Sequence, residues 1–231
     1  MNAGAFTGTA GWSIPRAHAL CFPEIGSSLS RYAAVFNATE INSTFYRPHR
    51  PSTFERWRDS VPDNFRFSVK VPKVITHEQR LMGAGGTFAA FVFSLSALDN
   101  RLGPLLLQLP PTLAFQAGVV ETFLKEANGV AGGTLVFEPR HPSWYSTEAD
   151  ALLAAYDVVR AGADPERSPG AFRPGGARRL TYLRLHGSPR VYFSAYEDRF
   201  IRGLAEQLAG MRPPAWCIFD NTASGQPPAM P

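Results

Sequence analysis

Short apolar segments recur along this chain, and each ends in a polar or charged residue. With these end residues as markers, successive segments follow one another at steps of 22 to 38 residues. A strand, a crossover helix and two loops need roughly 30 residues, so this spacing is typical of alternating strands and helices. The eight segments that we predict to be strands are Phe6–Gly11, Ala38–Asn42, Phe65–Val71, Leu105–Leu109, Thr134–Glu138, Val158–Asp164, Leu180–His186 and Trp216–Asn221.

Helical patterns fill most of the gaps between these strands. A Ser-x-x-Glu capping box, formed by Ser52 and Glu55, is expected to start one helix. The stretch from Pro165 to Arg178 contains Pro and Gly and is expected to be a loop. The predicted helices are Leu29–Phe36, Ser52–Trp57, Thr87–Asp99, Val119–Ala127, Glu148–Tyr156 and Tyr196–Leu208.

Continuous apolar strands that alternate with helices indicate an α/β fold with a parallel sheet covered by helices. Eight such units in 231 residues fit a (β/α)8 TIM-type barrel that occupies residues 1–231 as a single domain. An open doubly wound sheet is the rival fold, but no G-x-G-x-x-G or G-x-x-x-x-G-K motif follows a strand. Only ten residues follow Asn221, so we expect this barrel to lack a regular last helix.

The composition excludes several classes of protein. The apolar fraction of 45% and the charged fraction of 18% are globular values. No apolar run approaches the roughly 20 residues of a membrane span, so we expect no membrane association. The two cysteines, Cys21 and Cys217, are too few for a disulfide framework or a four-cysteine zinc site. We interpret them as buried thiols of a cytoplasmic protein.

The basic residues only weakly suggest a nucleic-acid partner. The formal net charge is +4, but the arginines are spread along the chain, with no block longer than Arg178-Arg179. A small polar or anionic ligand is the partner that the sequence favours, and the oligomeric state stays open.

The polar ends of the strands are the most informative feature for function. In a parallel barrel the carboxyl ends of the strands and the loops after them line one mouth. A charged residue within an apolar strand is costly unless it is paired or functional, and Lys70, Glu138 and Arg184 each lie in such a strand. We therefore predict a polar pocket with Glu40, Lys70, Glu138 and His186 as catalytic residues. The substrate-binding residues that we predict are Trp12, Asn42, Tyr46, His77, Gln108, Arg140, Trp144, Asp164, Arg184 and Asn221.

Six stretches of the chain closely resemble the YecE-like family, a domain of unknown function. They are Thr7–Ser13, Glu40–Arg47, Phe67–His77, Leu102–Pro111, Phe137–Trp144 and Leu183–Gly187. The resemblance covers nearly the whole chain. It implies a TIM-barrel fold and no particular reaction.

The main functional hypothesis is an enzyme that performs acid/base chemistry on a small sugar- or phosphate-like substrate. Lys70, Arg140 and Arg184 would hold carboxylate or phosphate oxygens, because cations bind such groups strongly. Glu40 or Glu138 would be the base, with His186 or His77 as its partner. Trp12, Phe45, Tyr46 and Trp144 would form walls around the substrate.

Three alternatives remain open from the sequence. The charges could pair with one another and plug the barrel, for example Lys70 with Glu138 or Glu40 with Arg184. A divalent metal held by Glu138, Asp164 and His186 would make the protein an isomerase or a phosphodiester hydrolase, although no other feature indicates a cofactor. The Arg-rich stretch Arg167–Arg179 favours a non-catalytic module that binds nucleic acid or protein.

Lys70 also raises the question of a Schiff base, because a buried strand lysine is a usual place for one. Carboxylates on the neighbouring strands are expected to pair with this lysine and keep it charged, which weighs against that chemistry.

Overall fold

All eight predicted strand segments form strands in the computed structural model, which describes residues 5–210 and 214–221. The segment Val158–Asp164 divides into two short strands, and an extra two-residue strand lies within the loop predicted from Pro165 to Arg178. The strands of the described residues are β1 (Phe6–Thr9), β2 (Ala38–Ile41), β3 (Arg66–Lys70), β4 (Leu102–Gln108), β5 (Leu135–Glu138), β6 (Val159–Arg160), β7 (Gly162–Asp164), β8 (Gly175–Gly176), β9 (Thr181–Leu185) and β10 (Ala215–Phe219).

These strands pair into two sheets. One has the order β2-β3-β4-β5-β6-β8, and the other has the order β1-β10-β9-β7. Every pair is parallel except β6 with β8. The predicted α/β class is therefore confirmed, with a mixed six-stranded sheet and a purely parallel four-stranded sheet.

The two sheets meet at two places. Between β6 and β7 the chain itself passes from one sheet to the other, with only Ala161 between the strands, and the Ala161 amide donates to the Phe137 carbonyl at 2.8 Å. Between β1 and β2 the backbone pairing is a bridge from Ala10 to Glu40. The (β/α)8 prediction is thus confirmed in part, because strands and helices alternate as predicted but the described residues do not form one continuous closed sheet.

The side chain of Tyr32 explains why β1 and β2 do not pair along their length. Its hydroxyl accepts a hydrogen bond from the Thr9 amide at 2.7 Å and donates one to the Ala38 carbonyl at 3.2 Å, so it stands between the two backbones. Gly8 permits the close approach here, because a Cβ at this position would lie 1.9 Å from the Ala38 carbonyl oxygen. Burial raises the pKa of Tyr32 to about 12, so the hydroxyl keeps the proton that it donates.

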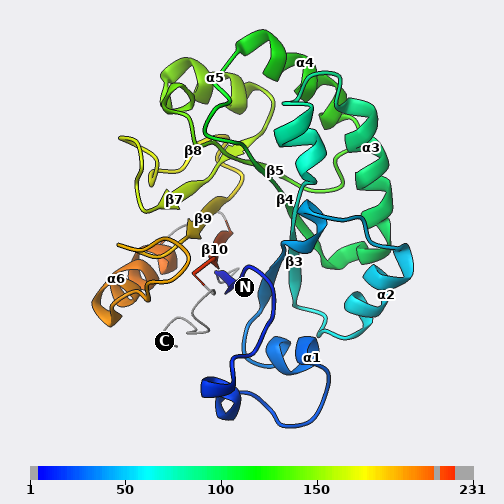
Figure 1. Ribbon diagram of the computed structural model, residues 1–231, viewed down its shortest axis with the longest axis vertical. Coiled ribbons are helices and arrows are strands. Elements are labelled where there is room, and N and C mark those ends of the chain that lie inside the picture. The colour runs from blue at the N-terminus through cyan, green and yellow to red at the C-terminus, as the bar shows by residue number, and fades with distance from the viewer. Residues whose placement is uncertain (1–4, 211–213, 222–231) are drawn as a thin grey trace.

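Helices follow one another around the central strands, as Figure 1 shows. The predicted capping box is wrong, because Arg50 precedes the second helix as its N-cap and Pro51 occupies the first turn. Proline suits that position, since its missing N–H would have no helical partner there. The helices are α1 (Ser28–Ala33), α2 (Pro51–Asp59), α3 (Gly85–Ser94), α4 (Ala117–Asn128), α5 (Thr147–Ala155) and α6 (Asp198–Ala209), with short helical turns η1 (Arg16–Cys21), η2 (Ser43–Phe45), η3 (Val74–Glu78), η4 (Leu95–Arg101) and η5 (Pro142–Tyr145).

An aromatic cluster fills one end of the space between the sheets. Trp216 stacks on Phe6 with ring centroids 4.7 Å apart and on Tyr182 at 6.1 Å. All three residues lie in the first half of their strands, next to the buried Leu106 and Val136. This end of the space between the sheets is therefore filled by aromatic and aliphatic side chains, and the charged side chains described below lie at the carboxyl ends of the strands.

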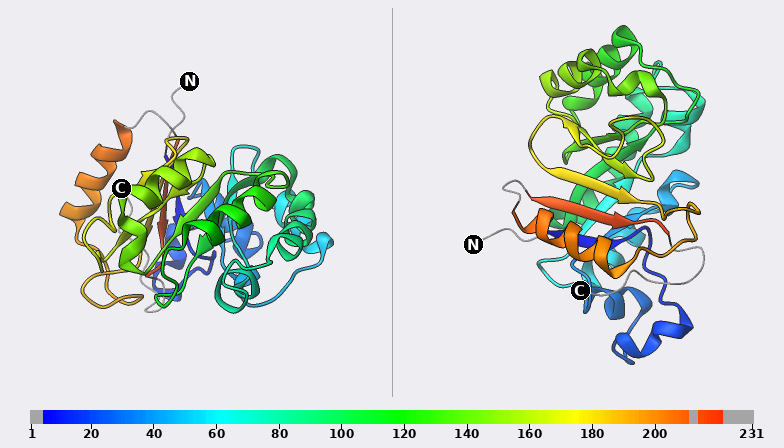
Figure 2. Two further views of the ribbon diagram at one scale, coloured as in Figure 1. Left: turned by 90° about the horizontal axis from the view of Figure 1, so that it is seen from above. Right: turned by 90° about the vertical axis from the view of Figure 1, so that its left-hand side faces the viewer.

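The outer faces of β9 and β10 are covered by α6, which lies along them in Figure 2. Cys217 is buried in this layer, where burial raises the pKa of its thiol to about 12. Cys21 is exposed, so the prediction of two buried thiols is wrong for this residue; both cysteines are free. None of the helices in the described part of the chain is long and apolar enough to cross a membrane. The expected lack of a last helix concerns residues 222–231, which lie outside the described residues.

The contact between β1 and β2 predicts a specific loss of stability. We expect Tyr32→Phe to lower the free energy of unfolding by about 1–3 kcal/mol, because the Thr9 amide and the Ala38 carbonyl lose a buried partner. Urea denaturation measures this change. Tyr46→Phe is the matched control, since Tyr46 is 69% exposed and we expect its loss of a hydroxyl to change little. Equal effects of the two substitutions would contradict this account of the contact.

Candidate functional site

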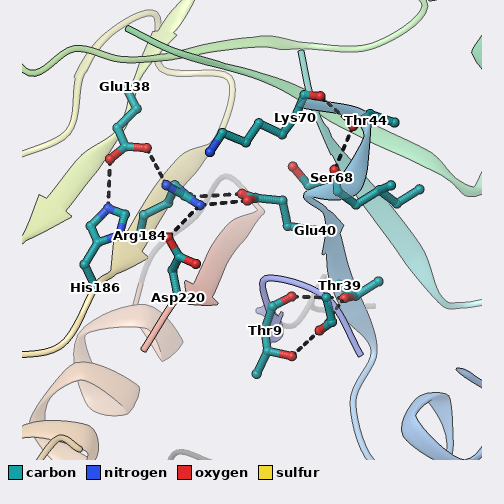
Figure 3. A network of polar contacts seen from close by, with 12 residues as sticks. Thr9, Thr39, Glu40, Thr44, Ser68, Lys70, Glu138, Arg184, His186 and Asp220 are labelled. Atoms are coloured by element: carbon teal, nitrogen blue, oxygen red, sulfur yellow. Dashed lines mark hydrogen bonds and ion pairs between the residues drawn. The ribbon is translucent and has the colours of Figure 1, made fainter. Parts of the chain in front are cut away.

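Charged side chains from five strands converge at the carboxyl ends of the sheets, as Figure 3 shows. The residues come from both sheets, and those predicted as catalytic are all buried. Side chains alternate between the two faces of a strand, so Tyr182, Arg184 and His186 point to the same side from β9 and its end. The group consists of Glu40, Lys70, Glu138, Arg184, His186 and Asp220.

Arg184 is the centre of this group. Its guanidinium binds both oxygens of Glu40, with Nε 3.0 Å from Oε2 and Nη2 2.7 Å from Oε1. It also donates from Nη1 to Glu138 Oε2 at 2.7 Å and from Nη2 to Asp220 Oδ2 at 3.1 Å. Arg184, Glu40 and Glu138 have no measurable exposure. Of the two pairings considered for a plug, the structure forms Glu40 with Arg184, while Lys70 and Glu138 form no ion pair.

His186 lies between two of these carboxylates. Its Nε2 is 2.8 Å from Glu138 Oε1, and its Nδ1 is 3.0 Å from Asp220 Oδ2. Arg140 approaches the same place, with Nη2 2.7 Å from Glu138 Oε1 and 3.0 Å from His186 Nε2. A neutral imidazole donates from only one of its two ring nitrogens, so it can donate to only one of these carboxylates at a time.

The cations keep the carboxylates ionised. Burial by itself would raise the pKa of Glu138, but Arg140 and Arg184 outweigh it and hold that pKa well below its usual value. Burial also opposes ionisation of Asp220, and again the charge of Arg184 prevails and lowers the pKa. Conversely, burial would lower the pKa of Arg184, but the surrounding carboxylates raise it well above its usual value. Glu138, Asp220 and Arg184 are therefore fixed charges at neutral pH.

Lys70 behaves differently from these paired charges. It is 5% exposed, and its ammonium lies 4.3 Å from the centre of the Phe45 ring, yet this ammonium forms no ion pair or hydrogen bond with a described residue. Burial, reinforced by Arg184, lowers the pKa of Lys70 to about 8, against the opposing effect of Glu40, Glu138 and Asp220. The expectation that neighbouring carboxylates pair with Lys70 is wrong, because Arg184 already binds them.

Tyr182, Ser68 and Asp220 belong to the same network, although the sequence did not single them out as site residues. The Tyr182 hydroxyl lies 3.1 Å from Glu40 Oε2 and 2.7 Å from the Ser68 hydroxyl. Tyr182 is two residues before Arg184 in the same strand, and this spacing was the signal that could have identified it. Asp220 is the penultimate residue of the last predicted strand, Trp216–Asn221, so its position near the strand end was visible although its role was not assigned.

Three aromatic residues predicted to bind substrate lie outside this group. Trp144 is completely buried in the hydrophobic core, and its Nε1 donates to the Leu113 carbonyl at 2.8 Å. Trp12 packs edge-on against Trp57 with ring centroids 5.0 Å apart. Tyr46 is largely exposed. These contacts are those of packing or surface residues, so we do not retain the three in the site.

The remaining predicted residues surround the charged group less directly. His77 packs edge-on against Phe45 with ring centroids 5.0 Å apart, and burial together with Lys70 lowers the pKa of its imidazole. Asn42 and Asn221 each have a buried side-chain oxygen without a hydrogen-bond partner among the described residues. Gln108 is the last residue of β4 and pairs with Glu138 in the sheet register. Roles for these four residues stay predictions.

The three residues considered as metal ligands are not brought together. The Asp164 carboxylate accepts a hydrogen bond from the Tyr196 hydroxyl at 2.6 Å, while Glu138 and His186 bond to each other. No group of three or more His, Cys, Asp or Glu side chains within residues 5–210 and 214–221 is arranged to hold a metal ion.

Comparison with known proteins identifies relatives of this chain. A family model described as "Protein of unknown function DUF72" matches residues 6–230. The UPF0759 protein YecE of Escherichia coli K12 is 36% identical over 108 residues, which are 46% of this chain and only 38% of the length of YecE.

Solved structures show the same fold. A DUF72 family protein of Thermotoga maritima has a TM-score of 0.76 at 23% identity, with 96% of this chain and 94% of that chain covered. A DUF72 family protein of Enterococcus faecalis has a TM-score of 0.76 at 20% identity, with 96% and 92% covered. An AP endonuclease of family 2 from Brucella melitensis is more distant, with a TM-score of 0.52 at 14% identity and 93% of each chain covered.

Because Lys70 is buried without an ion pair to a described residue, we predict that replacing it by an apolar residue stabilises the protein. We expect Lys70→Met to raise the free energy of unfolding at pH 7 by on the order of 1–3 kcal/mol, because burying this ammonium is unfavourable. The folded-state pKa of about 8 lies below the ordinary 10.5, so the unfolded chain binds this proton more tightly. Wild-type stability should therefore rise relative to the variant between about pH 8 and pH 10.5. Urea denaturation at pH 7 and near pH 10 tests this expectation.

Arg184→Met is the contrasting variant. It leaves Glu40 and Glu138 buried without their main partner, so we expect a loss of about 3–5 kcal/mol. If Lys70→Met also destabilises the protein at pH 7, Lys70 stabilises the cluster and the predicted gain in stability is wrong.

Proposed function

Because this chain belongs to the family described as Protein of unknown function DUF72, whose description names no reaction, we propose a function from the geometry of its own site. The protein is an enzyme that performs acid/base chemistry on a small polar or anionic substrate at the carboxyl ends of its strands. Lys70 and Arg140 bind oxygen atoms of the substrate, and His186 transfers protons. Arg184, Glu40, Glu138 and Asp220 hold this arrangement in place.

The observation that carries this proposal is the unused hydrogen-bonding capacity of two cations. The Lys70 ammonium has three N–H donors and forms no ion pair or hydrogen bond with a described residue, although Lys70 is only 5% exposed. The Arg140 Nε is buried without a hydrogen-bond partner among the described residues. A buried donor without an acceptor is unfavourable, so the Arg140 Nε favours a ligand that brings acceptor oxygens. The unused donors of Lys70, which like Arg140 lies near Glu138, favour the same kind of ligand. Carboxylate, phosphate and sugar oxygens all meet this requirement.

His186 is the group best suited to move a proton here. Both of its ring nitrogens face a carboxylate, and these carboxylates remain ionised because of the arginines. The fixed carboxylates orient the ring and stabilise it when it is protonated. Its 1% exposure restricts water, which strengthens these electrostatic interactions. Glu138, which we had also considered as the base, is more suited to positioning the imidazole.

We also propose that the two sheets act together as a single TIM-type barrel. The passage of the chain from β6 to β7 and the bridge from Ala10 to Glu40 both support this arrangement. A cytoplasmic location is a further proposal, supported by the two free cysteines.

A metal-assisted hydrolase is the weaker alternative. The fold resembles that of an AP endonuclease of family 2, but at 14% identity this likeness concerns the fold alone. Here Asp164 is engaged by Tyr196, and guanidinium groups contact Glu138, so the carboxylates already have cationic partners. In the Arg-rich segment, Arg179 forms an ion pair with Asp157, and nucleic-acid binding by this segment stays a prediction.

Inorganic phosphate serves as a probe of the proposed oxygen-binding site. We expect it to bind the wild-type protein and to bind Lys70→Met about tenfold or more weakly, because a charge-assisted hydrogen bond is lost. Isothermal titration calorimetry at constant ionic strength measures both affinities. Lys73→Met is the matched control, since the Lys73 ammonium is exposed and already paired with Glu78 at 3.1 Å. Equal weakening by both substitutions would mean that only the overall charge matters.

His186→Gln tests the acid/base role. Using a panel of sugar phosphates and small carboxylated sugars, we expect turnover of any substrate found to fall by about a hundredfold or more. Phosphate binding should change little, because the proposed oxygen donors are Lys70 and Arg140. Wild-type turnover rates in this variant would rule out His186 as the proton carrier.

A further inference from the structure

We propose that Lys70 forms an imine with a carbonyl group of the substrate, which makes small oxo-acids and related aldehydes or ketones the substrate class. This inference rests on the proposed function, because the same site binds the substrate. It goes further by assigning Lys70 a covalent bond rather than an ion pair. The following observations on Lys70 and its surroundings support it.

The three lysines of the chain are in very different surroundings. Lys73 pairs with Glu78 at 3.1 Å, and Lys125 pairs with Glu121 at 3.0 Å; the side chains of both lysines are at least half exposed. Lys70 alone of the three is buried, and it forms no ion pair with a described residue. An amine becomes a nucleophile only when it loses its proton, and burial without a counter-ion favours that loss.

The network in Figure 3 shows why Lys70 has no counter-ion although carboxylates are near. Its side chain extends from the end of β3 toward Arg184 and Glu138. Both oxygens of Glu40 and one of Glu138 accept from Arg184, while the other Glu138 oxygen accepts from Arg140 and contacts His186. The carboxylates of Glu40 and Glu138 are thus already bound by guanidinium groups, which offer several donors at once. The Lys70 ammonium therefore has no carboxylate partner among the described residues.

The Lys70 amine lies near charges of both signs. Glu40, Glu138 and Asp220 favour the ammonium form, while burial and the guanidinium of Arg184 oppose it, and His77 contributes a neighbouring imidazole. The resulting pKa of Lys70 is about 8. About one tenth of the molecules then carry a neutral amine at pH 7, compared with well under a thousandth for an ordinary lysine.

Imine formation at this site needs no oxidant or reductant. The Nζ lone pair attacks the carbonyl carbon, a C–N bond forms, and the carbonyl oxygen takes up a proton to give a carbinolamine. Nζ then loses a proton, a second proton reaches the oxygen, and the carbon–oxygen bond breaks, which releases water and leaves the protonated imine. Loss of the remaining N–H proton gives the neutral imine. His186 is suited to supply and recover these protons, since it lies between two ionised carboxylates.

Phe45 supports the same chemistry. Its ring lies 4.3 Å from the Lys70 Nζ, and an aromatic face stabilises a cation by electrostatic attraction. A protonated imine carries its positive charge at the same nitrogen. The ring therefore stabilises both the starting ammonium and the iminium. Arg140, with its unpartnered Nε, is available to bind a carboxylate on the substrate.

The test is reductive trapping with glyoxylate, the simplest aldehyde that carries a carboxylate. Wild-type protein is treated with glyoxylate and cyanoborohydride at pH 7, and peptide mass mapping locates each added carboxymethyl group. We expect Lys70 to be labelled at least about tenfold faster than Lys73 and Lys125, because far more of it is unprotonated. The labelling rate of Lys70 should level off above about pH 8, while that of the exposed lysines should continue to rise.

Two variants separate this inference from the proposed function. Lys70→Arg keeps the cation, so we expect phosphate binding to persist while trapping at residue 70 is abolished; Lys73→Arg should leave trapping of Lys70 unchanged. Circular dichroism confirms that each variant is folded. If wild-type Lys70 is labelled no faster than Lys73 while phosphate still binds, the imine is refuted and the proposed function stands. If neither phosphate binding nor preferential trapping depends on Lys70, both are refuted.

Discussion

A guanidinium without contact to water needs full compensation for its lost hydration. In this protein the carboxylates that provide this compensation for Arg184 relate the two sheets to each other. Arg184 belongs to β9 of the four-stranded sheet, whereas Glu40 and Glu138 belong to β2 and β5 of the six-stranded sheet. The ion pairs therefore cross from one sheet to the other. Each carboxylate reaches the guanidinium only if its strand has the right register, so the cluster fixes how the two sheets face each other at their carboxyl ends.

The same arrangement explains how a buried lysine without an ion pair in the described part of the chain can lie beside a cluster of paired charges. Arg184 offers donors in a planar fork and binds carboxylates in pairs, whereas the ammonium of Lys70 is a point charge that competes poorly for the same oxygens. The carboxylates therefore bind Arg184 and hold the cluster together. Lys70 is left buried and unpaired at a cost in stability, which is a common property of functional groups.

The sequence predicted the strands and the converging charges well, because both depend on local pattern. A charged residue in an apolar strand stands out, and Glu138, Arg184 and Lys70 were found in this way. The partners of each charge could not be predicted, since Arg184 and Glu40 are 144 residues apart and their pairing depends on the register across the sheets. Trp144 follows a strand end as a binding residue would, but the turn after Pro142 directs its ring into the core. Nothing local in the sequence indicates that the hydroxyl of Tyr32 separates β1 from β2.

Glu40 links the contact between the sheets to the chemistry of the site. Its backbone carbonyl accepts from the Gly11 amide at 2.9 Å beside the bridge to Ala10, and its side chain holds Arg184. The Thr39 hydroxyl, next in the chain, donates to the Thr9 carbonyl at 3.0 Å, so β1 and β2 are joined by side chains just below the charged group (Figure 3). Any shift of β1 relative to β2 would move Glu40 and, through it, Arg184. The geometry around Lys70 is consequently set by backbone contacts and buried ion pairs.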